Sequence, residues 1–92
     1  MIQKIKVSNL TSNKGNKIAN QFEIRTPKGV YFQSYDSIIA FWGNNNKITL
    51  DRYYWDYSTT TGKYRNRFLG ENIEETRRKI RSKEYKLKDL NK

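Results

Sequence analysis

Apolar and polar residues alternate along the first half of the chain with a period of two, which is typical of β-strands that face solvent on one side. Residues 38–42 differ because they are continuously apolar, which predicts a strand covered on both faces, with Phe41 and Trp42 in the core. Five strands within residues 2–51 predict a meander or a small curled sheet. The alternating stretches are residues 3–8, 18–26, 30–35 and 47–51.

Turn-forming residues separate these strands. Pro27 presets φ for a tight turn over residues 26–29, and Gly29 tolerates positive φ where the chain enters the next strand. Residues 18–35 are therefore predicted to form an antiparallel hairpin. Residues 9–16 are polar and contain glycine, which predicts an exposed loop. The expected faces are Ile18, Phe22 and Ile24 against Gln21, Glu23 and Arg25 in the second strand, and Ile48 and Leu50 inward in the fifth.

Helix signals follow the strands. Residues 59–69 are predicted to form a short helix, and residues 73 to about 82 a strongly basic one whose apolar stripe consists of Ile73 and Ile80. Alternation returns in residues 85–88 and predicts a final strand. We expect one α+β domain over residues 1–92, with an antiparallel sheet of four to six short strands followed by one or two helices packed on or beside it. The expected caps are Ser58 and Gly70 for the first helix, and Asn72 with Glu75 for the second.

Charge and composition narrow the class of partner. The chain has 92 residues with 19 Lys and Arg against 9 Asp and Glu, a net charge of +10. Such an excess attracts polyanions, although a solvated basic surface is the alternative. No stretch approaches the 18 or so apolar residues that span a membrane. The absence of cysteine fits a reducing compartment, and the N-terminus lacks the apolar run of a signal peptide.

The side chains available for catalysis are few. The chain contains neither histidine nor cysteine, which removes the usual general base near neutral pH and the ligands that zinc prefers. Metal-dependent chemistry would need carboxylates converging on one point. Asp56 is expected at a turn, and Glu74 and Glu75 in the first turn of a helix. We therefore expect a binding protein without catalytic residues, metal or cofactor.

Aromatic and basic residues gather in residues 53–70 and in the helix after them. Cations suit phosphates, and exposed aromatic rings suit the stacking of bases. For the aromatic residues of 53–57 the alternatives are a core position or a surface contact, and Tyr31 and Tyr35 are further rings that could stack bases. The candidate contact residues are Lys63, Arg65, Arg67, Arg77, Arg78, Lys79, Arg81, Lys83, Tyr53, Trp55, Tyr57 and Tyr64.

Four segments resemble a family of small phage and prophage proteins that have no assigned biochemical role. They are residues 16–22, 31–40, 54–66 (Tyr54-Trp55-Asp56-Tyr57-Ser58 and Thr61-Gly62-Lys63-Tyr64-Arg65-Asn66) and 68–71 with the helix behind them. The resemblance covers nearly the whole chain. It implies a viral accessory protein and supplies no catalytic residues.

Three functions are consistent with these features. The first is a non-enzymatic inhibitor of a host nucleic-acid-targeting defence system, in the manner of anti-CRISPR proteins, which acts in the host cytoplasm and binds a host effector or ribonucleoprotein through a basic face. The second is direct binding of DNA or RNA, with Tyr53, Trp55, Tyr57 and Tyr64 stacking on bases. The third is a virion or scaffold component. A positively charged protein of this kind is unsuited to DNA mimicry, which requires an acidic surface.

Overall fold

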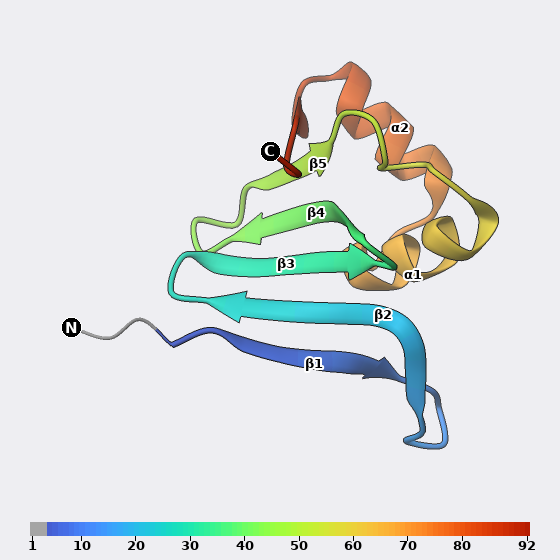
Figure 1. The fold of residues 1–92 in the computed structure, drawn as a ribbon. Helices are drawn as coiled ribbons and strands as arrows, with labels where there is room; N and C mark the ends of the chain where they lie inside the picture. The colour runs from blue at the N-terminus through green and yellow to red at the C-terminus, as the bar shows by residue number, and fades with distance from the viewer. Residues whose placement is uncertain (1–3) are drawn as a thin grey trace.

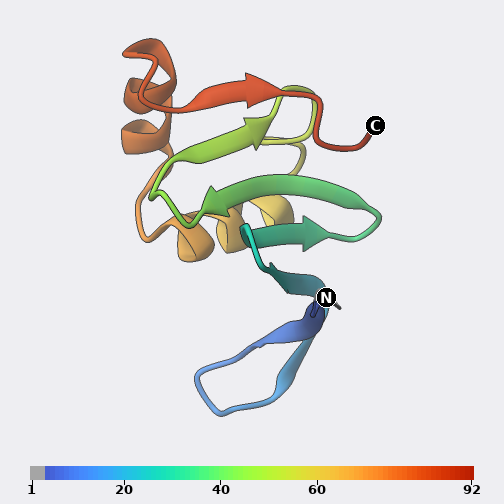
Figure 2. The same ribbon diagram turned by 90° about the vertical axis from the view of Figure 1, so that its left-hand side faces the viewer.

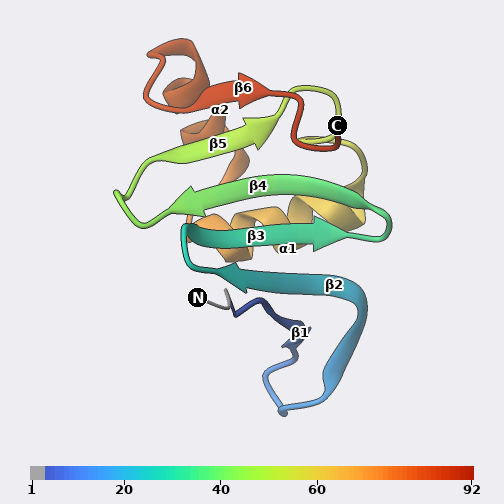
Figure 3. The same cartoon turned by 60° about the vertical axis from the view of Figure 1, so that its left-hand side comes forward.

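The fold is a six-stranded sheet with two helices on one of its faces, as the computed structural model of residues 4–92 shows (Figures 1 and 3). The strands lie side by side in chain order; neighbours are antiparallel, except that β6 runs parallel to β5. The predicted α+β fold is confirmed. The elements are β1 (Lys6–Thr11), β2 (Lys17–Thr26), β3 (Gly29–Ser34), β4 (Ser37–Gly43), β5 (Ile48–Asp51), α1 (Thr59–Leu69), α2 (Ile73–Arg81) and β6 (Lys86–Lys88).

Both helices have the predicted caps. The Ser58 side chain accepts a hydrogen bond from the backbone N–H of Thr61, and Gly70 ends α1 in the left-handed conformation. In α2, Asn72 and Glu75 form the reciprocal capping box, and the helix ends at Arg81, one residue before the predicted end. These ends follow from contacts within three or four residues, which is why they were predictable.

The first strand differs from its prediction. Residue 3 lies outside the described residues, and β1 continues to Thr11, so the expected loop over residues 9–16 is wrong for its first three residues. The strand is longer because Leu10 is buried in the core. The pairing of β1 with β2 has a register irregularity at this point, between Asn9 and Thr11. Beyond it, the tip of the β1–β2 hairpin bends away from the rest of the sheet (Figure 2).

The core lies between the sheet and the helices. Phe32, Ala40 and Leu50 are neighbours across β3, β4 and β5, and all three are fully buried. The ring of Phe68 from α1 stacks on that of Phe32, with the centroids 5.6 Å apart, and Leu69 joins the same cluster. Helix α1 is therefore held on the sheet by aromatic and aliphatic contacts near its C-terminal end.

The opposite face of the sheet carries no helix (Figure 3). The expectation that residues 38–42 are covered on both faces is therefore wrong: Trp42 packs against the core, whereas Phe41 lies on the uncovered face beside Tyr31. In β2 the predicted alternation holds from residue 21 to 25, but the buried position is Gln21, which shares the helix-covered face with Phe32. Phe22 and Ile24 are thus on the uncovered face, whereas Ile18, which was predicted to share their face, packs against the core.

Gly29 occupies a position where no side chain fits. Its φ is +153°, and a Cβ there would lie 2.4 Å from the carbonyl oxygen of Trp42 and 2.8 Å from the ring of Phe41. Replacement by alanine must displace the backbone of β4. The turn that Pro27 begins therefore needs glycine for close packing as well as for its backbone conformation.

We predict that Gly29→Ala lowers the free energy of unfolding by about 3 kcal/mol, since overpacking and a disfavoured φ act together. Urea unfolding at constant m-value measures the change. Gly15→Ala is the matched control, because Gly15 also has positive φ (+82°) but has open space around it. Its cost should stay near 1 kcal/mol, and equal losses in the two variants would contradict the steric explanation.

Candidate functional site

Six cations project from the helical layer, and we call them the basic face: Lys63, Arg67, Arg77, Arg78, Arg81 and Lys83. All six are exposed. In α2 this follows from helical periodicity, because Ile73, Thr76 and Ile80 lie toward the protein and the three arginines lie on the solvent side, C-terminal to the exposed Glu74 and Glu75 of the first turn. The candidate cations of residues 63–67 and of residues 77–83 are thus on one layer of the fold.

A cavity of about 660 Å³ opens between the two helices. Lys63 of α1 and Arg77 of α2 both line it, although they are separated by 14 positions in the chain. Asp56 is the one carboxylate in the lining and lies 3.7 Å from Arg77. Arg65 also lines the cavity. The lining therefore contains three cations and one carboxylate, and its net positive charge attracts an anionic group.

Arg65 does not belong to the exposed surface that the sequence predicted for it. Its side chain is 1% exposed, and the guanidinium donates to the carbonyl of Trp55 at 2.7 Å and to Asp56 at 3.1 Å. A third bond goes to Asn66, and the charge lies 5.3 Å from the centre of the Trp55 ring. The expected contact role is corrected: Arg65 holds the turn before α1 against the helix.

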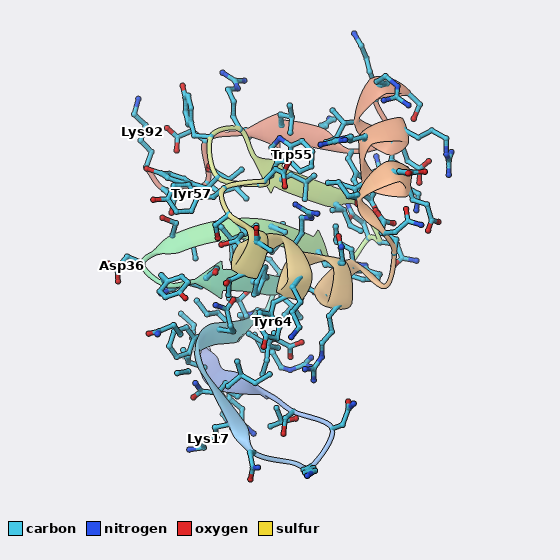
Figure 4. All side chains as sticks on the ribbon, turned by 90° about the vertical axis from the view of Figure 1, so that its right-hand side faces the viewer. Lys17, Asp36, Trp55, Tyr57, Tyr64 and Lys92 are labelled. Carbon is cyan, nitrogen blue, oxygen red and sulfur yellow. The ribbon has the colours of Figure 1, made fainter. Side chains whose placement is uncertain are left out.

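The aromatic residues of 53–57 divide between the two expected positions. Tyr53 and Tyr57 are exposed, whereas Tyr54 and Trp55 are half-buried against the core. Tyr64 is also half-buried and lies on the side of α1 near the β1–β2 hairpin (Figure 4). Of the four predicted stacking residues, only Tyr53 and Tyr57 therefore present most of their surface to solvent.

Asp51 organises the same region, and sequence reasoning missed it. The carboxylate is fully buried at the end of β5 and accepts bonds from the backbone N–H groups of Tyr53 and Tyr54 at 3.0 and 2.8 Å. Its other oxygen accepts from the Leu90 N–H at 2.7 Å and from the Asn91 amide at 3.0 Å. An aspartate at the start of a turn, whose side chain accepts a bond from the backbone N–H two residues on, is a known local signal. No local signal predicted the contacts from the C-terminal tail.

Glu71 forms a second buried cluster that the sequence did not reveal. It accepts bonds from Lys79 and the Tyr85 hydroxyl, both at 2.8 Å, and from Thr76 at 2.6 Å. Lys79, which the sequence predicted to contact a partner, is half-buried and its charge is paired with Glu71 within the protein. This cluster closes the loop between α2 and β6.

Hydrogen bonding changes the pKa values in this cluster. Burial raises the pKa of Glu71, but the bonds from Lys79, Thr76 and Tyr85 outweigh it, so the pKa lies below 4.5. The bond to Glu71 raises the pKa of Lys79. Burial and the bond to Glu71 raise the pKa of Tyr85 to about 12. The ion pair and the neutral tyrosine hydroxyl are therefore the stable forms at neutral pH.

Within residues 4–92, no group of three or more acidic side chains lies close enough together to hold a metal ion. In the same part of the chain, the two helices are too short and too polar to cross a membrane. Asp51 and Glu71 are already saturated by protein donors.

Comparison with known proteins identified one family. The family described as "Family of unknown function (DUF8033)" matches residues 5–86. No curated protein and no solved structure matched the chain. The match spans β1 to β5, both helices and the first residue of β6.

We predict that Asp51→Asn lowers the free energy of unfolding by about 2–4 kcal/mol, because an amide retains one acceptor and turns its NH₂ toward N–H donors. Urea unfolding measures the loss, and faster amide exchange at Tyr53 and Leu90 locates it. Asp89→Asn is the control, since Asp89 is exposed and accepts one bond, from the Asn91 N–H. If the control costs as much as Asp51→Asn, the buried carboxylate is not the organising group.

We predict that Glu71→Gln lowers stability at pH 7 and flattens its dependence on acidic pH. Because the folded-state pKa lies below 4.5, the stabilisation is present above that value and is lost as the pH falls through the folded pKa. Unfolding free energies measured from pH 7 to pH 3 should fall more steeply for the wild type than for the variant. Glu84→Gln, at an exposed position, should retain the wild-type slope; parallel curves for the wild type and Glu71→Gln would refute the linkage.

Proposed function

The chain belongs to the DUF8033 family, a family of unknown function, and on that premise we propose a function from its own surface. It is a non-enzymatic module that binds nucleic acid, free or held in a ribonucleoprotein, through the basic face. One observation carries this proposal: the cations that hold the fold together differ from the cations that are exposed to solvent. Arg65 and Lys79 are engaged within the protein, and the cations that remain on the helical layer are exposed.

The basic face has little internal neutralisation. Among the ion pairs formed within residues 4–92, only Arg77 of its six members takes part, and that contact with Asp56 is long, at 3.7 Å. Glu71, just before α2, pairs with Lys79, and among the described residues Glu74 and Glu75 of α2 form no ion pair with these six cations. A surface of this kind gains affinity for a phosphate backbone through the release of condensed counterions. A net charge of +10 also steers encounter with any polyanion.

The resemblance to phage accessory proteins suggests a setting for this binding. An inhibitor of a host nucleic-acid-targeting defence system would meet RNA or DNA phosphates on the effector, so the same face serves both hypotheses. The lack of histidine and cysteine favours action by occupancy. In this setting the protein acts in the host cytoplasm and binds a defence ribonucleoprotein.

We predict that reversal of Arg77, Arg78 and Arg81 to glutamate weakens binding of single-stranded DNA or RNA by more than about tenfold. If these side chains contact three phosphates, the slope of log K against log salt should decrease in magnitude by about 2. Fluorescence anisotropy of labelled strands at several salt concentrations measures both quantities.

The matched control reverses three exposed lysines away from the helical layer, Lys14, Lys17 and Lys28, which changes the net charge by the same amount. The control should retain most of the affinity. Equal losses would mean that net charge alone governs binding. If the wild type binds no nucleic acid, a pull-down from host lysate with the same pair of variants tests the ribonucleoprotein alternative.

A further inference from the structure

The uncovered face of the sheet carries an apolar row that the basic face does not explain. Val7, Ile24, Tyr31, Phe41 and Thr49 are successive partners across β1 to β5 and share this face. Val7 is 58% exposed, and the next three are half-buried. An antiparallel sheet with one free face usually presents polar residues there, and a contiguous apolar surface marks an interaction site.

Two aromatic rings form the centre of this row. Tyr31 and Phe41 lie on adjacent strands with their centroids 4.5 Å apart and their planes inclined by 38°. Phe41 rests against the paired glycines Gly29 and Gly43, where added Cβ atoms would lie 2.8 and 3.4 Å from its ring. The Phe41 ring is thus supported by the sheet backbone, and no helix lies on this face of the sheet (Figure 3).

Positive charge borders the row at the β5–β6 edge. Lys86 is the partner of Thr49, and Lys88, two positions on, shares the same face. The acids within the strands are Glu23 and Asp51: Glu23 pairs with Phe32 and so lies on the helix-covered face, and Asp51 is buried and saturated. The strand residues of the open face therefore contribute no exposed carboxylate.

The lysines of β6 also lie close to the basic face. Lys83 of the basic face lines a cavity of about 380 Å³ together with Lys86 and Lys88. Lys83 therefore lies beside the lysines of β6, the strand at the edge of the sheet. The apolar row ends at Thr49, the partner of Lys86 in the neighbouring strand.

We propose that the open face binds single-stranded nucleic acid, with bases stacking on Tyr31 and Phe41 and phosphates contacting Lys86 and Lys88. Aromatic rings on a flat sheet stack unpaired bases of any sequence, whereas the bases of a duplex are inaccessible to them. A second copy of the chain fits this face poorly, because two surfaces of like charge would meet. The inference rests on the proposed function and names its substrate as unpaired strands.

The test compares a labelled oligonucleotide as a single strand and as a duplex, titrated with the wild type and with Tyr31→Leu/Phe41→Leu. The leucines retain apolar volume and remove the stacking surface. The double variant should lose about tenfold or more in affinity for the single strand, with duplex binding and salt slope unchanged. Tyr57→Leu removes an exposed tyrosine outside this face that the sequence predicted to stack on bases. If the open face is the stacking surface, this variant should lose far less affinity for the single strand than the double variant.

Thr49→Glu is a second variant at a half-exposed position of the row, in case the double variant fails to fold. It should weaken single-strand binding and leave duplex binding unchanged. Wild-type affinity in every folded open-face variant overturns the inference. So does sedimentation that shows a dimer dissociated by these changes, or a loss of affinity in Tyr57→Leu alone.

The failures of the two proposals are distinguishable. If reversal of Arg77, Arg78 and Arg81 abolishes binding while Tyr31→Leu/Phe41→Leu leaves it intact, the basic face stands and the stacking surface is wrong. If the wild type binds neither the single strand nor the duplex, both proposals for free nucleic acid are wrong.

Discussion

A buried carboxylate at the end of β5 determines how the chain leaves the sheet. Asp51 is excluded from solvent, and a charge in that position requires hydrogen-bond donors. The turn after β5 supplies two N–H groups, and the C-terminal tail supplies one N–H and one amide. This one side chain therefore ties the sheet to the turn that leads into α1 and to the residues after β6. Arg65 and Glu71 repeat the arrangement, the first at the turn before α1 and the second between α2 and β6.

These three groups explain how a small protein with a net charge of +10 maintains its helical layer. The aromatic contacts of α1 with β3 are few, and α2 presents a thin apolar stripe. Directed hydrogen bonds from buried charges supply the orientation that a larger core would otherwise provide. Arg65 and Lys79 form these internal bonds. The exposed cations of the helical layer are therefore those of the basic face.

The placement of both helices on one face gives the molecule two different surfaces. One is cationic and built on helices; the other is apolar and aromatic, built on the sheet, and bordered by lysines of β6. Charge attracts phosphate without regard to base pairing, whereas stacking requires unpaired bases. The two surfaces approach each other at the free edge of β6, where Lys83, Lys86 and Lys88 line one cavity.

The sequence by itself determined the features that depend on neighbours a few residues away. The caps at Ser58, Gly70 and Asn72 follow from local backbone geometry, as does the alternation that marks the strands other than β4. Tertiary structure alone decided which of the cations became structural and which face of the sheet the helices cover. Arg65 lies in a run of exposed-looking basic residues, and its burial depends on Trp55, ten positions earlier. The bond from Leu90 to Asp51 spans 39 positions. Alternation separates the two faces of a strand, but the face that is buried depends on where the later helices pack.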